Sequence, residues 1–143
     1  MKTLIYTFRT FLHIEELKQI FPEVIVFGRL KEDLDNFCKQ IMKEKPDMIL
    51  GIALSNDSVF EPKAINHFNG NLKIIKDGKE ELSLFVPNLQ NQDFKVSAKP
   101  TDSFCNYSMY KIKHFLEENN LDIPFAFTHI KKEDIKKLID TLG

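Results

Sequence analysis

One cysteine in the sequence has a setting that favours nucleophilic chemistry. Residues 101–103 (TDS) can each cap a helix, so Cys105 is expected in the first turn of a helix that runs to about residue 119. The N-terminus of a helix carries about half a positive elementary charge and unpaired N–H groups, and it therefore favours a thiolate. Cys38 lacks this setting, because helical spacing places it on a buried helix face, where a cysteine acts as a small hydrophobic residue.

A base and an orienting acid for this thiol are found elsewhere in the chain. His129 ends a predicted strand, and open α/β sheets bind their ligands at the carboxyl ends of parallel strands. The helix that begins near Cys105 faces the same edge, so the imidazole is placed to act as its base. Glu61, on a polar segment after another predicted strand, can accept a hydrogen bond from the imidazole and fix its tautomer. Taken singly, each residue also has a common structural role: Cys105 as a packed thiol, His129 as a hydrogen-bonded side chain and Glu61 as a solvated carboxylate.

The segments around these residues resemble those of pyroglutamyl peptidase I, also called pyrrolidone-carboxylate peptidase, a cysteine peptidase family that removes N-terminal pyroglutamate. Residues 61–66 (EPKAIN) are similar to the family's E-R-V-A-I-N element. Residues 104–107 (FCNY) resemble its nucleophile element, which contains a C-N pair, and residues 127–130 (FTHI) are similar to its F-I-H-[IV]-P element. The order of the three elements is also the family's. The resemblance implies that the glutamate, cysteine and histidine form a catalytic triad.

The same resemblance implies which residues bind the substrate. Residues 7–11 (TFRTF) look like a degraded form of the family's G-F-x-P-F element, whose two phenylalanines line the pocket for the lactam ring. Phe8 and Phe11 are therefore expected in the pocket, together with Asn106 of the C-N pair. The family's Gly-rich stretch ending in arginine is reduced here to Gly51, so the Cys105 backbone N–H, with help from Asn56, is expected to stabilise the oxyanion.

Two further departures separate this chain from the family pattern. Glu61 is followed by Pro62 instead of arginine, and the histidine element ends in Lys131 instead of proline. The chain is also shorter than typical members of the family. The resemblance therefore does not assign the residues that complete the substrate pocket.

The elements that must position these residues alternate between short apolar runs and amphipathic segments. Strands are predicted at 2–8, 24–28, 47–54, 93–98 and 124–129, and helices at 14–20, 31–44, 101–119 and 133–142. Residues 71–85 are predicted to form a β-hairpin around the turn dipeptide Asp77-Gly78. The expected fold is α/β: one domain over residues 1–143, a three-layer α/β/α sandwich of the phosphorylase/hydrolase-like type, with a mixed, mostly parallel sheet and a hairpin appendage.

Composition excludes several classes of function. The 143 residues contain 20 Lys and Arg against 21 Asp and Glu, a net charge of −1, which argues against nucleic acid or an acidic membrane surface as partner. No apolar run approaches the length of a membrane span or a signal peptide, so a cytoplasmic protein is expected. The four histidines show no metal-ligand spacing, and the chemistry needs no metal or cofactor. The predicted hairpin exposes edge strands that can pair between subunits, so a homo-oligomer is expected.

The favoured function is a cysteine exopeptidase that hydrolyses the amide bond after an N-terminal pyroglutamyl residue through a thioester. Its partner is a peptide with a blocked, pyroglutamyl N-terminus. Two alternatives stay open. The altered pocket favours a different cysteine acyl or amide hydrolase, and the loss of the Gly-rich and arginine region favours a noncatalytic descendant that binds a small ligand.

Overall fold

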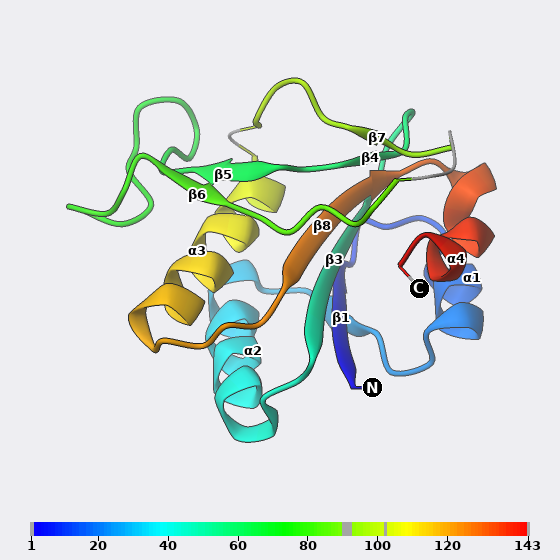
Figure 1. Ribbon diagram of the computed structural model, residues 1–143, viewed down its shortest axis with the longest axis horizontal. Helices are drawn as coiled ribbons and strands as arrows, with labels where there is room; N and C mark the ends of the chain where they lie inside the picture. The colour runs from blue at the N-terminus through cyan, green and yellow to red at the C-terminus, as the bar shows by residue number, and fades with distance from the viewer. Residues whose placement is uncertain (1, 90–92, 102, 143) are drawn as a thin grey trace.

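The computed structural model describes residues 2–89, 93–101 and 103–142. Its centre is a six-stranded sheet in the order β2-β1-β3-β8-β4-β7 (Figure 1). The strands are β1 (Thr3–Phe8), β2 (Ile25–Phe27), β3 (Met48–Leu54), β4 (Val59–Phe60), β7 (Lys95–Val96) and β8 (Phe125–Ile130). The strands β2, β1, β3 and β8 run parallel, whereas β4 is antiparallel to β8 and parallel to β7. The predicted mixed, mostly parallel sheet is confirmed.

Helices cover both faces of this sheet, which gives the predicted three layers. Figure 1 shows α2 and α3 on one face and α1 and α4 on the other. The helices are α1 (Ile14–Ile20), α2 (Leu30–Glu44), α3 (Phe104–Glu118), the 3-10 helix η1 (Lys132–Lys137) and α4 (Leu138–Leu142). Alternate residues of β1 enter the two cores, Tyr6 and Phe8 on the α2–α3 side and Ile5 on the side of α1 and α4. No helix in the described part of the chain has the length and apolarity to cross a membrane.

Gly51 of β3 permits a close approach of two aromatic rings in the α2–α3 core. It is the register partner of Tyr6 on one side and of Phe127 on the other. A Cβ atom at this position would lie 2.4 Å from the Phe127 ring and 2.6 Å from the Tyr6 ring. The glycine therefore leaves room for both rings, and Phe127 lies two residues before His129 on β8.

The hairpin prediction is correct in kind and wrong in its first strand. The antiparallel pair consists of β5 (Lys63–Ile65) and β6 (Glu81–Ser83), which lie beside α3 (Figure 1). Residues 73–75, predicted as strand, belong to the connection. The buried amide of Asn66 holds them there, because its Oδ1 accepts hydrogen bonds from the N–H groups of Ile74 (2.8 Å) and Ile75 (2.9 Å). The Asn66 side chain therefore accepts the hydrogen bonds that a partner strand would accept in a hairpin.

Three other boundaries differ from the predictions. The two-residue strand β4 was not predicted, since so short a strand has no readable periodicity. The strand predicted over 93–98 is reduced to Lys95–Val96, because only these residues pair with β4. The C-terminal helix begins as a 3-10 turn and becomes α-helical at Leu138.

Candidate active site

Cys105 lies in the first turn of α3, as predicted. The helix is capped by Ser103, whose Oγ accepts a hydrogen bond from the Cys105 N–H at 3.3 Å. Thr101 in turn accepts from the N–H of Ser103, whereas Asp102, the third candidate cap, lies outside the described residues. The cap thus engages the Cys105 N–H, the group that was expected to stabilise the oxyanion. The Cys105 residue is buried, with 4% exposure.

Strand pairing brings His129 and Glu61 together. His129 of β8 is the register partner of Val59 in the antiparallel strand β4, and the Glu61 N–H, just beyond β4, donates to the carbonyl of Phe127 at 2.9 Å. The two side chains then meet, with 2.9 Å between His129 Nδ1 and Glu61 Oε2. Glu61 is 3% exposed and the His129 side chain 18%, so this contact is largely shielded from water.

The pKa of His129 depends on Cys105 as well as on Glu61. Burial by itself lowers the pKa of the imidazole, but hydrogen bonds to Cys105 and to Glu61, with the charges of both partners, outweigh it and raise the pKa to about 9. Since Nδ1 bonds to Glu61, Nε2 is the ring nitrogen left for another partner. The imidazole accordingly favours its protonated form at neutral pH, the form that pairs with a thiolate.

The two predicted pocket phenylalanines enter opposite cores. Phe8 packs near the nucleophile, with its ring centroid 4.8 Å from that of Phe104 in an edge-to-face arrangement. Phe11 belongs to the core on the other side of the sheet, with Leu17 and Ile52. The structure therefore brings Phe8 to the region of Cys105 and does not bring Phe11 there.

The two predicted asparagines are also away from the reacting groups. The Asn106 side chain is fully buried and bonds to the backbone: its Oδ1 accepts from the Ile65 N–H, and its Nδ2 donates to the carbonyls of Ile65 and His67. It ties α3 to β5 and leaves no amide proton for a ligand. Asn56 is exposed and lines a neighbouring hollow with His13 and Lys132, which shares Lys131 with the hollow described next.

A hollow of about 710 Å³ opens beside the histidine and the glutamate, and we call it the triad hollow, although Cys105 is not among the residues that line it. It lies over β8, β4 and β7, whose alternate side chains share one face of the sheet. Its lining includes Asp57, Val59, Glu61, Lys95, His129 and Lys131. The hollow is thus polar and charged, unlike the apolar pocket expected for a lactam ring.

The comparisons identify a shared fold. No family model and no curated protein matches the sequence. Among solved structures, pyrrolidone carboxyl peptidase from Thermococcus litoralis has a TM-score of 0.72 at 18% identity, covering 92% of this chain and 77% of that one. This chain has the fold of the pyrrolidone carboxyl peptidases.

Two further structures support the same assignment of fold. The pyrrolidone carboxyl peptidase from Thermus thermophilus has a TM-score of 0.71 at 19% identity, covering 96% of this chain and 88% of that one. Pyroglutamyl peptidase I from Bacillus amyloliquefaciens has a TM-score of 0.73 at 16% identity, covering 92% and 82%. The structural resemblance therefore extends well beyond the three short motifs, through most of the chain.

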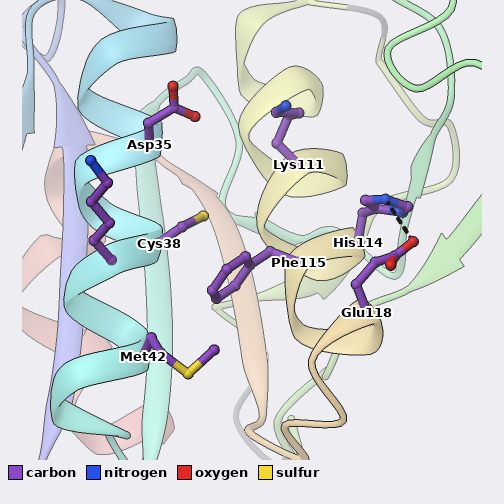
Figure 2. Close-up of a pocket in the computed structure, with 8 residues that line it drawn as sticks. Asp35, Cys38, Met42, Lys111, His114, Phe115 and Glu118 are labelled. Atoms are coloured by element: carbon purple, nitrogen blue, oxygen red, sulfur yellow. Dashed lines mark ion pairs between the residues drawn. The ribbon is translucent and has the colours of Figure 1, made fainter.

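The other cysteine, Cys38, lines a different groove from the triad hollow. Figure 2 shows Cys38 of α2 and Phe115 of α3 directed into the groove between these helices, with His114 and Glu118 joined by an ion pair. Burial raises the pKa of the Cys38 thiol to about 11, so the sulfur is protonated at neutral pH. Cys38 is partly buried and lines this groove, whereas its helical spacing predicted a buried face.

Sequence reasoning missed a buried hydrogen-bond network that braces the segments on either side of the histidine and the glutamate. The Ser58 Oγ donates to Asp134 Oδ2 at 2.6 Å and accepts from the Lys131 N–H at 3.1 Å. Ser58 precedes β4, whereas Lys131 follows β8. The contact spans 76 residues between a common serine and a common aspartate, and no local motif reveals such a pair.

The described residues contain no group of three or more His, Cys, Asp or Glu side chains that could hold a metal ion.

Proposed function

We propose that the protein is a cysteine hydrolase that cleaves the amide bond after an N-terminal pyroglutamyl residue. One observation carries the proposal: an imidazole that is hydrogen-bonded to a buried glutamate has its pKa raised by a cysteine at a helix N-terminus as well as by that glutamate. Thiol, imidazole and carboxylate in this order form the arrangement that nucleophilic acyl transfer requires. The shared fold of the pyrrolidone carboxyl peptidases supports the same reaction class.

The mechanism follows from the residue types. The Cys105 thiolate attacks the carbonyl carbon, forming a C–S bond and an oxyanion, which the remaining N–H groups in the first turn of α3 stabilise. The His129 imidazolium gives its proton to the amide nitrogen as the C–N bond breaks, and the amine leaves. The imidazole then takes a proton from water, whose oxygen attacks the thioester, and the acid is released as the thiol leaves. Glu61 keeps the imidazole oriented and stabilises its cation throughout.

A different acyl or amide substrate is the second candidate, and two observations favour it. Phe11 packs in the opposite core from Cys105, so a ring pocket built from both phenylalanines is not assembled. The triad hollow is lined by charged side chains, and a neutral lactam has no charge for them to bind. This candidate keeps the same triad and the same thioester step.

Hydrolysis of a pyroglutamyl fluorogenic amide tests the proposal. We expect wild-type protein to release the fluorophore, Cys105→Ala to lose this activity, and the matched control Cys38→Ala to keep it, because Cys38 lies in a different groove. Absence of hydrolysis, together with rapid alkylation of Cys105 below pH 7, would select the second candidate. Ordinary thiol reactivity at Cys105 without hydrolysis would instead indicate a noncatalytic binding protein.

A further inference from the structure

We propose that the triad hollow binds the leaving half of the substrate through a carboxylate, which makes N-acyl amino acids and short acyl peptides with a free C-terminus the substrate class. Lys95 and Lys131 are the residues that recognise the carboxylate. This inference rests on the proposed hydrolase function, and it adds the chemistry recognised beyond the scissile bond.

Strand register places one lysine directly across from the base. His129, Val59 and Lys95 are register partners on three successive strands, β8, β4 and β7, and all three line the triad hollow. Neighbouring strands lie about 4.8 Å apart, so the Cα atoms of His129 and Lys95 are separated by roughly 10 Å. A flexible four-carbon stem allows the lysine ammonium to lean over this gap. The amine that leaves once His129 has protonated its nitrogen would therefore lie near the Lys95 ammonium.

The second lysine approaches the same space from the strand of the base. Lys131 follows His129 by two residues, so its side chain leaves the same face of the extended chain. Its ammonium has no carboxylate within ion-pair distance among the residues that the structure describes, and the same holds for Lys95. Both ammoniums are therefore available to a ligand.

The charges that line the hollow leave a positive excess. Glu61 is paired with His129, and Asp93 shares the Lys137 ammonium with Asp134, at 3.2 Å and 3.4 Å respectively. Asp57 faces the same hollow and has no ion pair with any residue in the described ranges, so it opposes one of the two lysines. Two uncommitted ammoniums against one uncommitted carboxylate favour an anionic ligand.

The buried glutamate indicates what else the ligand carries. Glu61 Oε1 has no hydrogen-bond donor among the described residues, although Oε2 is occupied by the imidazole. A buried carboxylate oxygen without a donor is costly, and an N–H of the occupant would satisfy it. A molecule with an N–H near the triad and a carboxylate a short distance away is an amino acid or the first residues of a peptide.

Alkylation of Cys105 tests the positive excess without any need for turnover. The rate with iodoacetate, an anion, is divided by the rate with neutral iodoacetamide, using mass spectrometry to separate Cys105 from Cys38. At about 0.1 M ionic strength the Debye length is about 10 Å, so charges close to the triad act on the reagent whereas distant charges are largely screened. We expect the double variant Lys95→Gln/Lys131→Gln to lower the ratio about two- to fivefold. The control is Lys136→Gln, which removes an exposed charge from η1 outside the triad hollow and is expected to leave the ratio unchanged. An unchanged ratio in the double variant would overturn the inference.

A matched pair of substrates separates this inference from the proposed function. The pair is a pyroglutamyl amino acid with a free carboxylate and the same compound as its carboxamide. We expect the carboxylate form to be hydrolysed with the higher kcat/KM, and Lys95→Gln to raise KM for that form alone. Equal kcat/KM values for the two forms would overturn the carboxylate subsite and leave the hydrolase function standing. If neither form is hydrolysed, the pyroglutamyl specificity fails, and the alkylation ratio alone decides whether the hollow attracts anions.

Discussion

The imidazole of His129 is the residue on which the chemistry of this site converges. Two cysteines of one chain show why environment matters more than residue type: Cys38 lies between two helices with its thiol pKa raised by burial, whereas Cys105 lies at a helix N-terminus against an imidazole. Glu61 bonds to Nδ1 of the ring. Removing either neighbour of the imidazole therefore changes its protonation.

Titration of His129 by NMR tests this description. We expect a pKa of about 9 in the wild-type protein and a lower pKa in Cys105→Ala, because burial opposes the cation and one of its two hydrogen-bonded partners is lost. Cys38→Ala serves as the matched control and is expected to leave the pKa of His129 unaltered, since Cys38 is not among the groups that act on it. A value of about 9 in both cysteine variants would show that the sulfur of Cys105 does not contact the ring.

At the scale of elements, the site lies where two strands end and a helix begins: β4 ends just before Glu61, β8 ends one residue after His129, and α3 begins one residue before Cys105. The β5–β6 pair lies beside the start of α3 because the amide of Asn106 bonds to the backbone of Ile65. The segment between β5 and β6 is fixed in turn by a second buried asparagine. The surroundings of the nucleophile thus depend on side-chain amides as much as on strand pairing.

Asn66→Ala tests the role of that second asparagine. The Asn66 amide bonds to the backbone N–H groups of Ile74 and Ile75 and to the carbonyls of Ile75 and Gly78, and its loss leaves these groups without their partner. We expect the free energy of unfolding to fall by about 1–3 kcal/mol and amide hydrogen exchange to accelerate in residues 72–78. Asn71→Ala, an exposed site in the same connection, provides the comparison. Similar stability losses in the two variants would contradict the assigned role.

Most of the framework was predictable from sequence, because long elements repeat their hydrophobic pattern. The period of α2 and the apolar runs of β1, β3 and β8 identify those elements, and the helix start at Cys105 follows from its cap. The strands β4 and β5 were missed, since two or three residues contain no period. Residues 73–75 were taken for a strand, but their N–H partner is a side chain 8 or 9 residues away.

The candidate site was predictable to a similar extent and for a similar reason. Motifs identify the three candidate residues, Glu61, Cys105 and His129, because each motif is local. The side of the sheet that a residue enters is not local, and the motif therefore does not show that Phe11, expected in the pocket, packs in the core on the other side from Cys105. The lysines of the triad hollow carry no motif at all, and only the register of β4, β7 and β8 places them beside the base.

At the scale of the whole molecule, the site lies where the sheet changes from parallel to antiparallel pairing, at the junction of β8 and β4. Several contacts between distant parts of the chain meet at this junction. The Thr128 hydroxyl donates to the Val59 carbonyl at 2.8 Å, and Ser58 bonds to Asp134. Folding must therefore be largely complete before the imidazole meets its two partners. The protonation of His129 is accordingly linked to the stability of the entire fold.

The pH dependence of unfolding tests this linkage. The folded-state pKa of His129 is raised to about 9, whereas an unfolded histidine titrates near 6.5. A raised pKa means that the folded state binds the proton more tightly, so the stabilisation is fully present below pH 6.5 and is lost as the pH rises through 9. Urea unfolding of wild-type protein and His129→Gln across this range isolates the contribution, because the groups that the two proteins share largely cancel in the difference. We expect the free-energy advantage of the wild-type protein to shrink steadily between pH 6.5 and 9 and to level off above that. An advantage that stayed constant, or grew with pH, would mean that the folded protein does not hold the imidazolium between Cys105 and Glu61.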